Sequence, residues 1–212
     1  MGGQITALRI QRRNRQRVNV YLDGRFAFGL TAMEAARLRV GQFLSDEDIA
    51  RLRQRDAAER AAEQALDLLS YRPRSEAEIR ERLSDRYGAE TTGEVLERLR
   101  RTGLVDDREF AHYWVQNRFQ HNPRGVVVLR QELRRKGVDD SAIEEALADY
   151  DEEAAAIRAA ETACRKLRGL APDTFRRRLT DYLLRRGFPY GIVQSIIQQF
   201  QTAAGSEDSA WL

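Results

Sequence analysis

Arginine dominates the side chains of this sequence that could bind a charged partner. Of the 36 basic residues only Lys136 and Lys166 are lysines, so almost all of the positive charge is carried by guanidinium groups. A guanidinium group presents a planar fork of N–H donors that fits a carboxylate or a phosphate. The composition therefore suits the binding of an anionic partner, but the base composition of the genome would equally explain so many arginines, and exposed ion pairs within the protein would use the same side chains.

The basic residues are concentrated in two segments, even though the net charge is only +3. Residues 118–136 contain six basic residues and one acidic residue, whereas residues 165–186 contain eight and two. Between them, residues 139–161 contain nine acidic residues and one arginine. Such segregation can steer an anionic partner to one surface. The candidate partner-binding or DNA-binding residues are Arg72, Arg74, Arg118, Arg124, Arg130, Arg134, Arg135, Lys136, Arg176, Arg177, Arg178, Arg185 and Arg186.

Residues that usually carry catalysis or bind metals are scarce. Cys164 is the only cysteine, which excludes an internal disulfide and a cysteine-based metal cluster, and helical spacing predicts it to be a small core residue. His112 and His121 lie nine positions apart without the carboxylate pattern of a zinc site or a triad. No phosphate-binding glycine loop or pair of catalytic carboxylates is recognisable. The sequence therefore predicts a binding protein rather than an enzyme, with no metal and no cofactor.

The overall composition favours a helix-rich protein. The hydrophobic share is 42%, the charged share is 33% and the aromatic share is 8%. No apolar run reaches the length of about 18 residues that a membrane span requires, and the start MGGQITALRIQRR lacks a signal-peptide pattern. We therefore expect a cytoplasmic protein that makes no membrane contact.

The first fifty or so residues differ from the rest in predicting β-structure. Two β-prone runs, VNVYL and RFAFGL, flank Asp23-Gly24, which is a strong hairpin signal because these residue types tolerate positive φ. Thr31 with Glu34 is expected to cap a short helix that ends near Gly41, and residues 45–48 to cap another. The arginines of the turn before the hairpin, Arg12, Arg13, Arg15 and Arg17, could contact phosphates. A small antiparallel sheet with a docking or scaffold role is predicted.

A pattern of six positions then recurs three times, at steps of about 50 residues. The recurring residues are Pro73, Pro123 and Pro172; Ile79, Leu129 and Leu179; Leu83, Leu133 and Leu183; Gly88, Gly137 and Gly187; Val95, Ile143 and Val193; and Leu99, Leu147 and Ile197. Proline ends a first helix, apolar residues four apart give a second helix its buried stripe, and glycine ends that helix. Each repeat is therefore predicted to be a triplet of helices.

The predicted fold is mainly α. Tandem three-helix repeats stack to hide the apolar surface that each leaves exposed, which predicts an elongated, curved body behind a small N-terminal β-hairpin or β-sheet subdomain. The predicted parts are residues 1–54 (β-hairpin and short helices), 55–105, 106–151 and 152–201 (repeats 1, 2 and 3), and 202–212 (a disordered tail).

Four segments carry a resemblance to a known family. They are YRPRSEAEIRERL at 71–83, GLVDDREFA at 103–111, QELRRKGV at 131–138 and YLDGRFAFGL at 21–30. The chain resembles, over roughly residues 5 to 200, the RecX family of regulators of the bacterial recombinase RecA. Repeat 3 departs most from the pattern, with Asp173 where Arg74 and Arg124 stand in the other repeats.

The resemblance implies a non-catalytic cytoplasmic protein that binds along the groove of the RecA filament on single-stranded DNA. There it would modulate, and usually inhibit, ATP hydrolysis, strand exchange and the co-protease role that serves the SOS response, DNA repair and recombination. Binding to single-stranded or double-stranded DNA is a further expectation, and a monomer is expected.

The residues leave open one other role for the motif GLVDDREFA and one other function for the chain. GLVDDREFA is first of all a joint between repeats, in which Asp106 or Asp107 caps the next helix, and only second a partner contact. A helix-turn-helix transcription regulator is the alternative function, because three-helix units with basic helices resemble that motif. Glu94, Glu97, Glu144 and Glu145 on the third helices argue against it, since they would repel a major groove.

Overall fold

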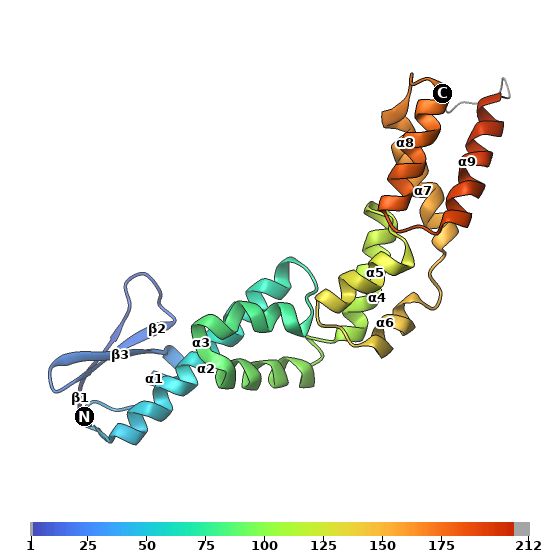
Figure 1. Cartoon of the computed structure of the whole chain (residues 1–212). Coiled ribbons are helices and arrows are strands. Elements are labelled where there is room, and N and C mark those ends of the chain that lie inside the picture. Colours follow the sequence, from blue (N-terminus) through green and yellow to red (C-terminus); the bar gives the residue numbers. More distant parts are fainter. Residues whose placement is uncertain (1, 206–212) are drawn as a thin grey trace. The chain divides into compact units, whose positions relative to one another are not determined.

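The computed structural model describes residues 2–205 as two compact units, coloured from blue to green and from green to red in Figure 1. Unit 1 comprises the residues up to 74 together with 78–105. Unit 2 comprises residues 75–77 and the chain from 106 onward. Each unit is described by itself.

Unit 1 begins with a four-stranded antiparallel sheet. Its strands β1 (Gly3–Ile10), β2 (Arg17–Leu22), β3 (Arg25–Thr31) and β4 (Phe43–Leu44) lie in the order β3-β2-β1-β4. Asp23 and Gly24 connect β2 to β3 with φ angles of 48° and 80°, which are the positive values that a type I′ turn requires. The predicted hairpin is confirmed, and β4 adds an edge strand beyond it.

A short helix lies between β3 and β4, and a helix much longer than expected follows β4. The Thr31 hydroxyl accepts the Glu34 N–H and caps α1 (Ala32–Ala35), which ends well before Gly41. A reciprocal capping box of Ser45 and Asp48 starts α2 (Asp46–Tyr71). This helix runs unbroken through residue 54, the predicted end of the N-terminal part. Its first turns pack on the sheet and its later turns belong to repeat 1, so one helix serves both cores.

Repeat 1 is completed by α3 (Glu76–Arg101). Gly88 interrupts this helix with φ 79° and ψ 166°, so α3 consists of two helical halves. Repeat 1 is therefore a triplet made of α2 and the two halves of α3, as predicted.

Unit 2 contains two further triplets. Repeat 2 comprises α4 (Asp107–His121), α5 (Val126–Arg135) and α6 (Asp140–Leu147), and repeat 3 comprises α7 (Glu152–Leu167), α8 (Pro172–Arg185) and α9 (Tyr190–Gly205). Residues 202–205 of the tail that was predicted to be disordered belong to α9, and the rest of that tail lies outside the described residues. The mainly α fold with tandem three-helix repeats is confirmed, while the elongated, curved arrangement of all three stays a prediction.

The repeated apolar positions have equivalent surroundings. Ile79, Leu129 and Leu179 are each 0% exposed, as are Leu83, Leu133 and Leu183. The glycines that follow, Gly88, Gly137 and Gly187, all have positive φ, between 77° and 84°. A left-handed residue ends the helix at the same place in each triplet, which confirms the role predicted for glycine.

The prolines are less equivalent than the sequence pattern suggested. Pro123 lies before α5, whose N-cap is Gly125, whereas Pro172 is the first residue of α8. Proline fits this first position because the helix would not use its missing N–H there. As a result α8 has 14 residues and α5 has 10.

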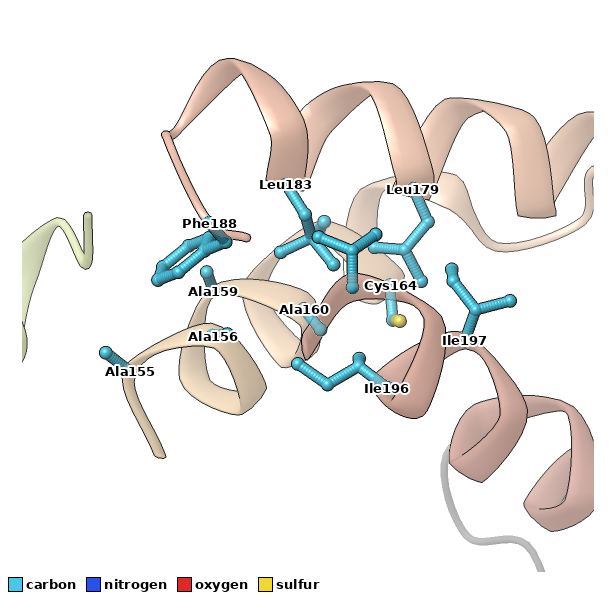
Figure 2. Close-up of a cluster of buried hydrophobic side chains, with 12 residues drawn as sticks. Ala155, Ala156, Ala159, Ala160, Cys164, Leu179, Leu183, Phe188, Ile196 and Ile197 are labelled. Atoms are coloured by element: carbon cyan, nitrogen blue, oxygen red, sulfur yellow. The ribbon is translucent and has the colours of Figure 1, made fainter. Parts of the chain in front are cut away.

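The core of repeat 3 is built on small residues. Ala155, Ala156, Ala159, Ala160 and Ala163 of α7 are buried, together with Cys164, as predicted for this cysteine. Figure 2 shows Leu179 and Leu183 of α8 above this small-residue face, with Ile196 and Ile197 of α9 beside it. Alanine on α7 lets the other two helices of the triplet approach closely, so that the triplet is well packed.

Candidate partner-binding surface

Within unit 2, repeats 2 and 3 meet at a joint made of backbone and side-chain hydrogen bonds. The Gly125 N–H donates to the Arg186 carbonyl at 2.9 Å, and the Val126 N–H donates to the Glu152 carboxylate at 2.7 Å. The Tyr150 hydroxyl donates to the Arg124 carbonyl at 2.7 Å. Burial raises the pKa of Tyr150 to about 12, so this hydroxyl remains a donor throughout the neutral range.

The joint requires glycine at its centre. A Cβ on Gly125 would lie 2.0 Å from the carbonyl oxygen of Gly187, far inside contact distance. A Cβ on Gly187 would meet the Val128 side chain at 2.4 Å. The backbone at Gly125 of repeat 2 is therefore in direct contact with the backbone at Gly187 of repeat 3.

Two predicted binding residues serve this joint. The Arg186 guanidinium donates to the Asn122 side chain and to the Pro123 carbonyl, and it lies 4.5 Å from the centre of the Tyr182 ring. Burial lowers the pKa of Arg186. The Nε of Arg124 is also buried and has no hydrogen-bond partner within residues 2–205.

Within unit 2, residues 75–77 also contact repeat 2. The Asp107 carboxylate accepts the Glu76 N–H at 2.8 Å, and a Cβ on Gly137 would lie 2.5 Å from that of Ala77. Burial raises the pKa of Asp107. Asp106 caps α4 by accepting the N–H groups of Arg108 and Glu109. The prediction that this aspartate pair caps the helix is confirmed by Asp106, while the joint that it would build between repeats 1 and 2 stays a prediction.

The predicted residues of unit 1 fix the connection between α2 and α3. Arg72 forms two hydrogen bonds of 3.0 Å with the Glu78 carboxylate. Arg74 donates from Nε to the Leu68 carbonyl at 3.0 Å, and burial lowers its pKa. Both side chains therefore stabilise the connection between α2 and α3 by hydrogen bonds within unit 1.

Most cations of repeat 2 are already neutralised. Arg130 forms a two-pronged ion pair with Glu144 at 2.7 and 2.9 Å, and the Arg134–Asp140 distance is 2.7 Å. The hydrogen bond from Arg130 lowers the pKa of Glu144. Arg135 is exposed and forms no ion pair within the described part of the chain.

Two further cations of repeat 2 enclose an indole ring. The Cζ of Arg118 lies 4.5 Å from the Trp114 ring and the Nζ of Lys136 lies 4.1 Å from it. The Glu132 carboxylate accepts from both Arg118 and the Trp114 indole N–H. These contacts stabilise the repeat by cation–π attraction and hydrogen bonding, which occupies side chains predicted to contact a partner.

Repeat 3 presents its cations to solvent. We use the name repeat-3 basic face for Lys166, Arg176, Arg177, Arg178 and Arg185, all of them exposed. Lys166, Arg178 and Arg185 line a groove of about 300 Å³ between α7 and α8, together with Asp181 and Tyr182. Only Arg176 has a carboxylate within 4.0 Å among residues 2–205, and its distance to Asp173 is 3.6 Å. This face can offer guanidinium donors to an external anion without first breaking a strong ion pair.

The sequence explains why the two repeats differ. At the step of 50 residues, the three acids that neutralise repeat 2, Glu132, Asp140 and Glu144, become Tyr182, Tyr190 and Gln194. At the same step, Val126–Val128 become Arg176–Arg178. Repeat 3 has therefore gained cations and lost the acids that would pair with them.

One residue of this face was missing from the prediction. Lys166 belongs to the groove, although only the arginines of α8 were among the candidates from repeat 3. The signal was the short basic run of residues 165–168 at the end of α7. Within residues 2–205 no group of three or more histidine, cysteine or acidic side chains is placed to hold a metal ion, and no helix there is both long and apolar enough to cross a membrane.

Four family models match the chain in succession. They are the regulatory protein RecX N-terminal domain at residues 3–44 and the first, second and third three-helix domains of RecX at 61–99, 106–147 and 151–197. The regulatory protein RecX of Bacillus licheniformis is 32% identical over 97% of this chain and 81% of its own length. That of Amycolatopsis mediterranei is 36% identical over 71% of this chain and 88% of its own length.

Solved structures agree with these matches. A crystal structure of a regulatory protein RecX covers 92% of this chain at 27% identity with a TM-score of 0.67, and 99% of that chain is covered. The crystal structure of RecX from Lactobacillus salivarius covers 69% of this chain at 25% identity with a TM-score of 0.57, and 98% of that chain is covered.

Proposed function

This chain belongs to the RecX family of regulatory proteins, and from that premise we propose that it binds the RecA filament on single-stranded DNA and inhibits it. The activities it lowers are ATP hydrolysis, strand exchange and the co-protease function of the filament. It acts in the cytoplasm as a monomer without catalysis of its own, and its setting is DNA repair, recombination and the SOS response.

The observation that best supports this proposal is the repeat-3 basic face, where four of the five cations have no carboxylate within 4.0 Å among residues 2–205. Five cations lie on one helix pair, and three of them line the groove between α7 and α8. A nucleoprotein filament offers both carboxylates and phosphates, and guanidinium groups bind either in two-pronged fashion. The face therefore fits an anionic polymer better than a small neutral substrate.

Inhibition requires a difference in affinity between states of the filament. A protein shifts an equilibrium only by as much as it binds one state more tightly than the other. We propose that this chain binds best to the filament state that turns over ATP slowly, and thereby populates that state.

The helix-turn-helix alternative has less support. In that motif the recognition helix enters the major groove and carries donors for base edges and phosphates. The third helix of repeat 2 contains Asp140, Glu144 and Glu145 without a cation, and residues 190–200 of α9 contain no charged residue. Neither helix is suited to approach duplex DNA.

The decisive experiment measures RecA filaments on single-stranded DNA with increasing amounts of the full-length protein. We expect ATP hydrolysis and strand exchange to fall at micromolar concentrations or below. Activity that stays unchanged at those concentrations would contradict the proposal, and a sequence-specific footprint on duplex DNA without RecA would favour the transcription regulator.

The role of the basic face is tested by paired variants of equal charge. Arg178→Gln with Arg185→Gln should weaken filament binding about tenfold or more, because a hydrogen bond to a charged group contributes about 1.5–3 kcal/mol. Arg130→Gln with Arg134→Gln removes the same charge from repeat 2, where both side chains are already paired, and should change binding far less. Equal losses in the two variants would remove the basic face from the interface.

The salt dependence of the same binding reaction separates ionic from apolar contact. If cations of the basic face displace counterions, affinity falls steeply as salt is added, and the variant of Arg178 and Arg185 has a shallower slope. A response that is flat for both proteins contradicts an ionic interface.

A further inference from the structure

A second concentration of positive charge lies in unit 1, in a cleft between the sheet and the helices α2 and α3. We call it the cationic cleft. It has a volume of about 430 Å³ and is lined by Arg17, Ala27, Phe28, Gly29, Arg53, Asp56, Ala57, Arg60, Arg86 and Tyr87. Four guanidinium groups thus share one concave space with a single carboxylate. Except for Arg17, none of these arginines was among the residues that the sequence singled out.

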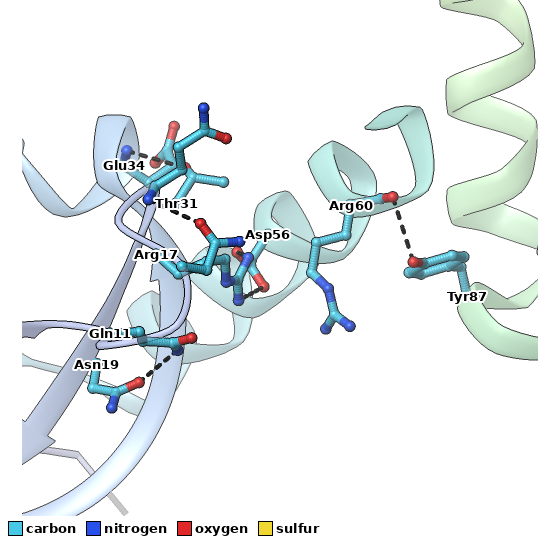
Figure 3. A network of polar contacts seen from close by, with 10 residues as sticks. Gln11, Arg17, Asn19, Thr31, Glu34, Asp56, Arg60 and Tyr87 are labelled. Carbon is cyan, nitrogen blue, oxygen red and sulfur yellow. Dashed lines mark hydrogen bonds and ion pairs between the residues drawn. The ribbon is translucent and has the colours of Figure 1, made fainter. Parts of the chain in front are cut away.

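Both oxygens of the single carboxylate accept hydrogen bonds from one of the four arginines. Arg17 of β2 and Asp56 of α2 form a two-pronged ion pair at 2.7 and 2.9 Å, and their side chains are only 15% and 8% exposed. Figure 3 shows this pair between the sheet and α2, with the two side chains directed toward each other. Asp56 is therefore unable to neutralise a further cation of the cleft.

Two contacts hold the walls of the cleft in place. The Arg53 guanidinium donates to the Ala27 carbonyl at 3.2 Å and lies 5.4 Å from the centre of the Phe28 ring. The Tyr87 hydroxyl of α3 donates to the Gln64 side chain of α2 at 3.2 Å. Arg53 is thus oriented in advance, with further N–H donors left over for another acceptor.

The remaining two arginines come from different helices. Arg60 belongs to α2 and Arg86 to α3, and neither has a carboxylate within 4.0 Å among residues 2–205. Arg86 lies 5.5 Å from the Tyr87 ring, and Figure 3 marks no hydrogen bond or ion pair between the Arg60 side chain and the Arg17–Asp56 pair. Arg53, Arg60 and Arg86 therefore repel one another across the same space.

We propose that the cationic cleft binds a phosphate group. An anion in the cleft would relieve the repulsion among the three arginines, and their forked donors match the oxygens of a phosphate. A phosphate ester carries more charge and more acceptor oxygens than a carboxylate, which suits three uncompensated guanidinium groups better. The cleft is also within the size range of small-ligand sites. Both a free phosphorylated compound and the phosphodiester of a nucleic acid strand supply this chemistry. The proposal does not depend on the partner proposed above, since its test contains no recombinase.

The test uses the full-length protein with two probes, inorganic pyrophosphate and a short thymidylate oligonucleotide. Binding is followed by calorimetry and by the backbone amide signals of Ala27, Phe28 and Gly29 in NMR spectra. We expect at least one probe to shift these amide signals in a saturable way. Arg60→Gln with Arg86→Gln should weaken that binding about tenfold or more, because each lost charge-assisted contact contributes about 1.5–3 kcal/mol.

The matched control is Arg82→Gln with Arg101→Gln, which removes the same charge from exposed positions of α3 outside the cleft. This variant should bind both probes as the natural protein does. Far-ultraviolet circular dichroism confirms that each variant is folded, and Arg53→Gln supplies a second, single-site test should the double variant fold poorly.

The two probes distinguish the sources of the phosphate. Saturable shifts with pyrophosphate assign the cleft to a free phosphorylated compound, and shifts with the oligonucleotide alone assign it to a nucleic acid strand. The proposal is overturned if neither probe shifts the three amide signals, or if the cleft variant and the control lose affinity equally.

Discussion

Repeats 2 and 3 share a plan of three helices, and their leucines are buried equally, but they differ in what surrounds those leucines. In repeat 2 the cations of α5 are bound by acids of α6, as in the pairs of Arg130 and Arg134. In repeat 3 the acids are absent and α8 carries three consecutive arginines, Arg176–Arg178. The apolar core is thus common to both repeats, while the charged surface is particular to each.

The difference reflects the place of each repeat in the series. Gly125, Val126 and Val128 form the surface of repeat 2 on which repeat 3 is docked through Gly187 and Glu152. At the step of 50 residues, repeat 3 has Phe175 and Arg176–Arg178 instead. A bulky ring and three cations would prevent a further repeat from docking in the same way.

The largest effect is expected from Gly125→Ala, which introduces a side chain into the joint where repeat 3 packs on repeat 2. Because the new Cβ would lie 2.0 Å from a backbone oxygen, repeats 2 and 3 must separate or shift. We expect a loss of about 3 kcal/mol in the free energy of unfolding, at the upper end of overpacking costs. Urea unfolding followed by circular dichroism measures it.

The control for this change is Gly191→Ala in the first turn of α9. No atom lies within 4 Å of its added Cβ, and alanine favours the helix. Its unfolding free energy should therefore stay level or rise slightly. A joint variant that proves as stable as this control would show that the two repeats are not packed as described.

A smaller effect is expected from Tyr150→Phe. At the step of 50 residues Tyr150 corresponds to Phe200, so this variant gives repeat 2 the side chain that repeat 3 has at the same place. The ring remains against both cores, but the hydrogen bond to the Arg124 carbonyl is lost. Leaving that carbonyl without its donor should cost about 1 to 2 kcal/mol of unfolding free energy. The measurement is again urea unfolding, and an unchanged midpoint would mean that water replaces the tyrosine.

The smallest effect is expected from Glu144→Gln. At the step of 50 residues Glu144 corresponds to Gln194, so this variant gives repeat 2 the side chain that repeat 3 has at the same place. The hydrogen bond from Arg130 lowers the pKa of Glu144 in the folded protein below its unfolded value. The ionised Glu144 therefore stabilises the folded protein when the pH is above its pKa in the unfolded chain. This stabilisation is lost as the pH falls through its lower pKa in the folded protein. The variant should be slightly less stable than the natural protein at pH 7, and the gap should close in acid.

Thermal unfolding at a series of pH values below neutral checks this. Glu161→Gln is the control, because Glu161 is exposed and forms no ion pair within the described residues. A stability gap that persists below the folded pKa would mean that Glu144 acts through packing rather than charge. If the prediction holds, the freed Arg130 should also raise the affinity of repeat 2 for anions, making it more like repeat 3.

Much of the fold could be predicted because it depends on local chemistry. The hairpin follows from Asp23 and Gly24, which tolerate positive φ. The triplets follow from helices that carry apolar residues four positions apart and end at a glycine. The unbroken course of α2 was not predicted, because its first turns and its later turns belong to two different cores. Sequence spacing shows where apolar faces recur, but not which cores a single helix joins.

The candidate sites depended far more on tertiary structure. The sequence by itself determined that cations are abundant, that they recur beside the repeated leucines, and that repeat 3 lacks the acids of repeat 2. Only the folded chain decided that Arg186 lies half-buried in a joint, that Arg130 is paired, and that Arg178 faces an open groove. It alone placed Arg53, Arg60 and Arg86 around one cleft. The physical reason is that the availability of a charge depends on distances to other charges and to solvent, and packing sets those distances between residues far apart in the sequence.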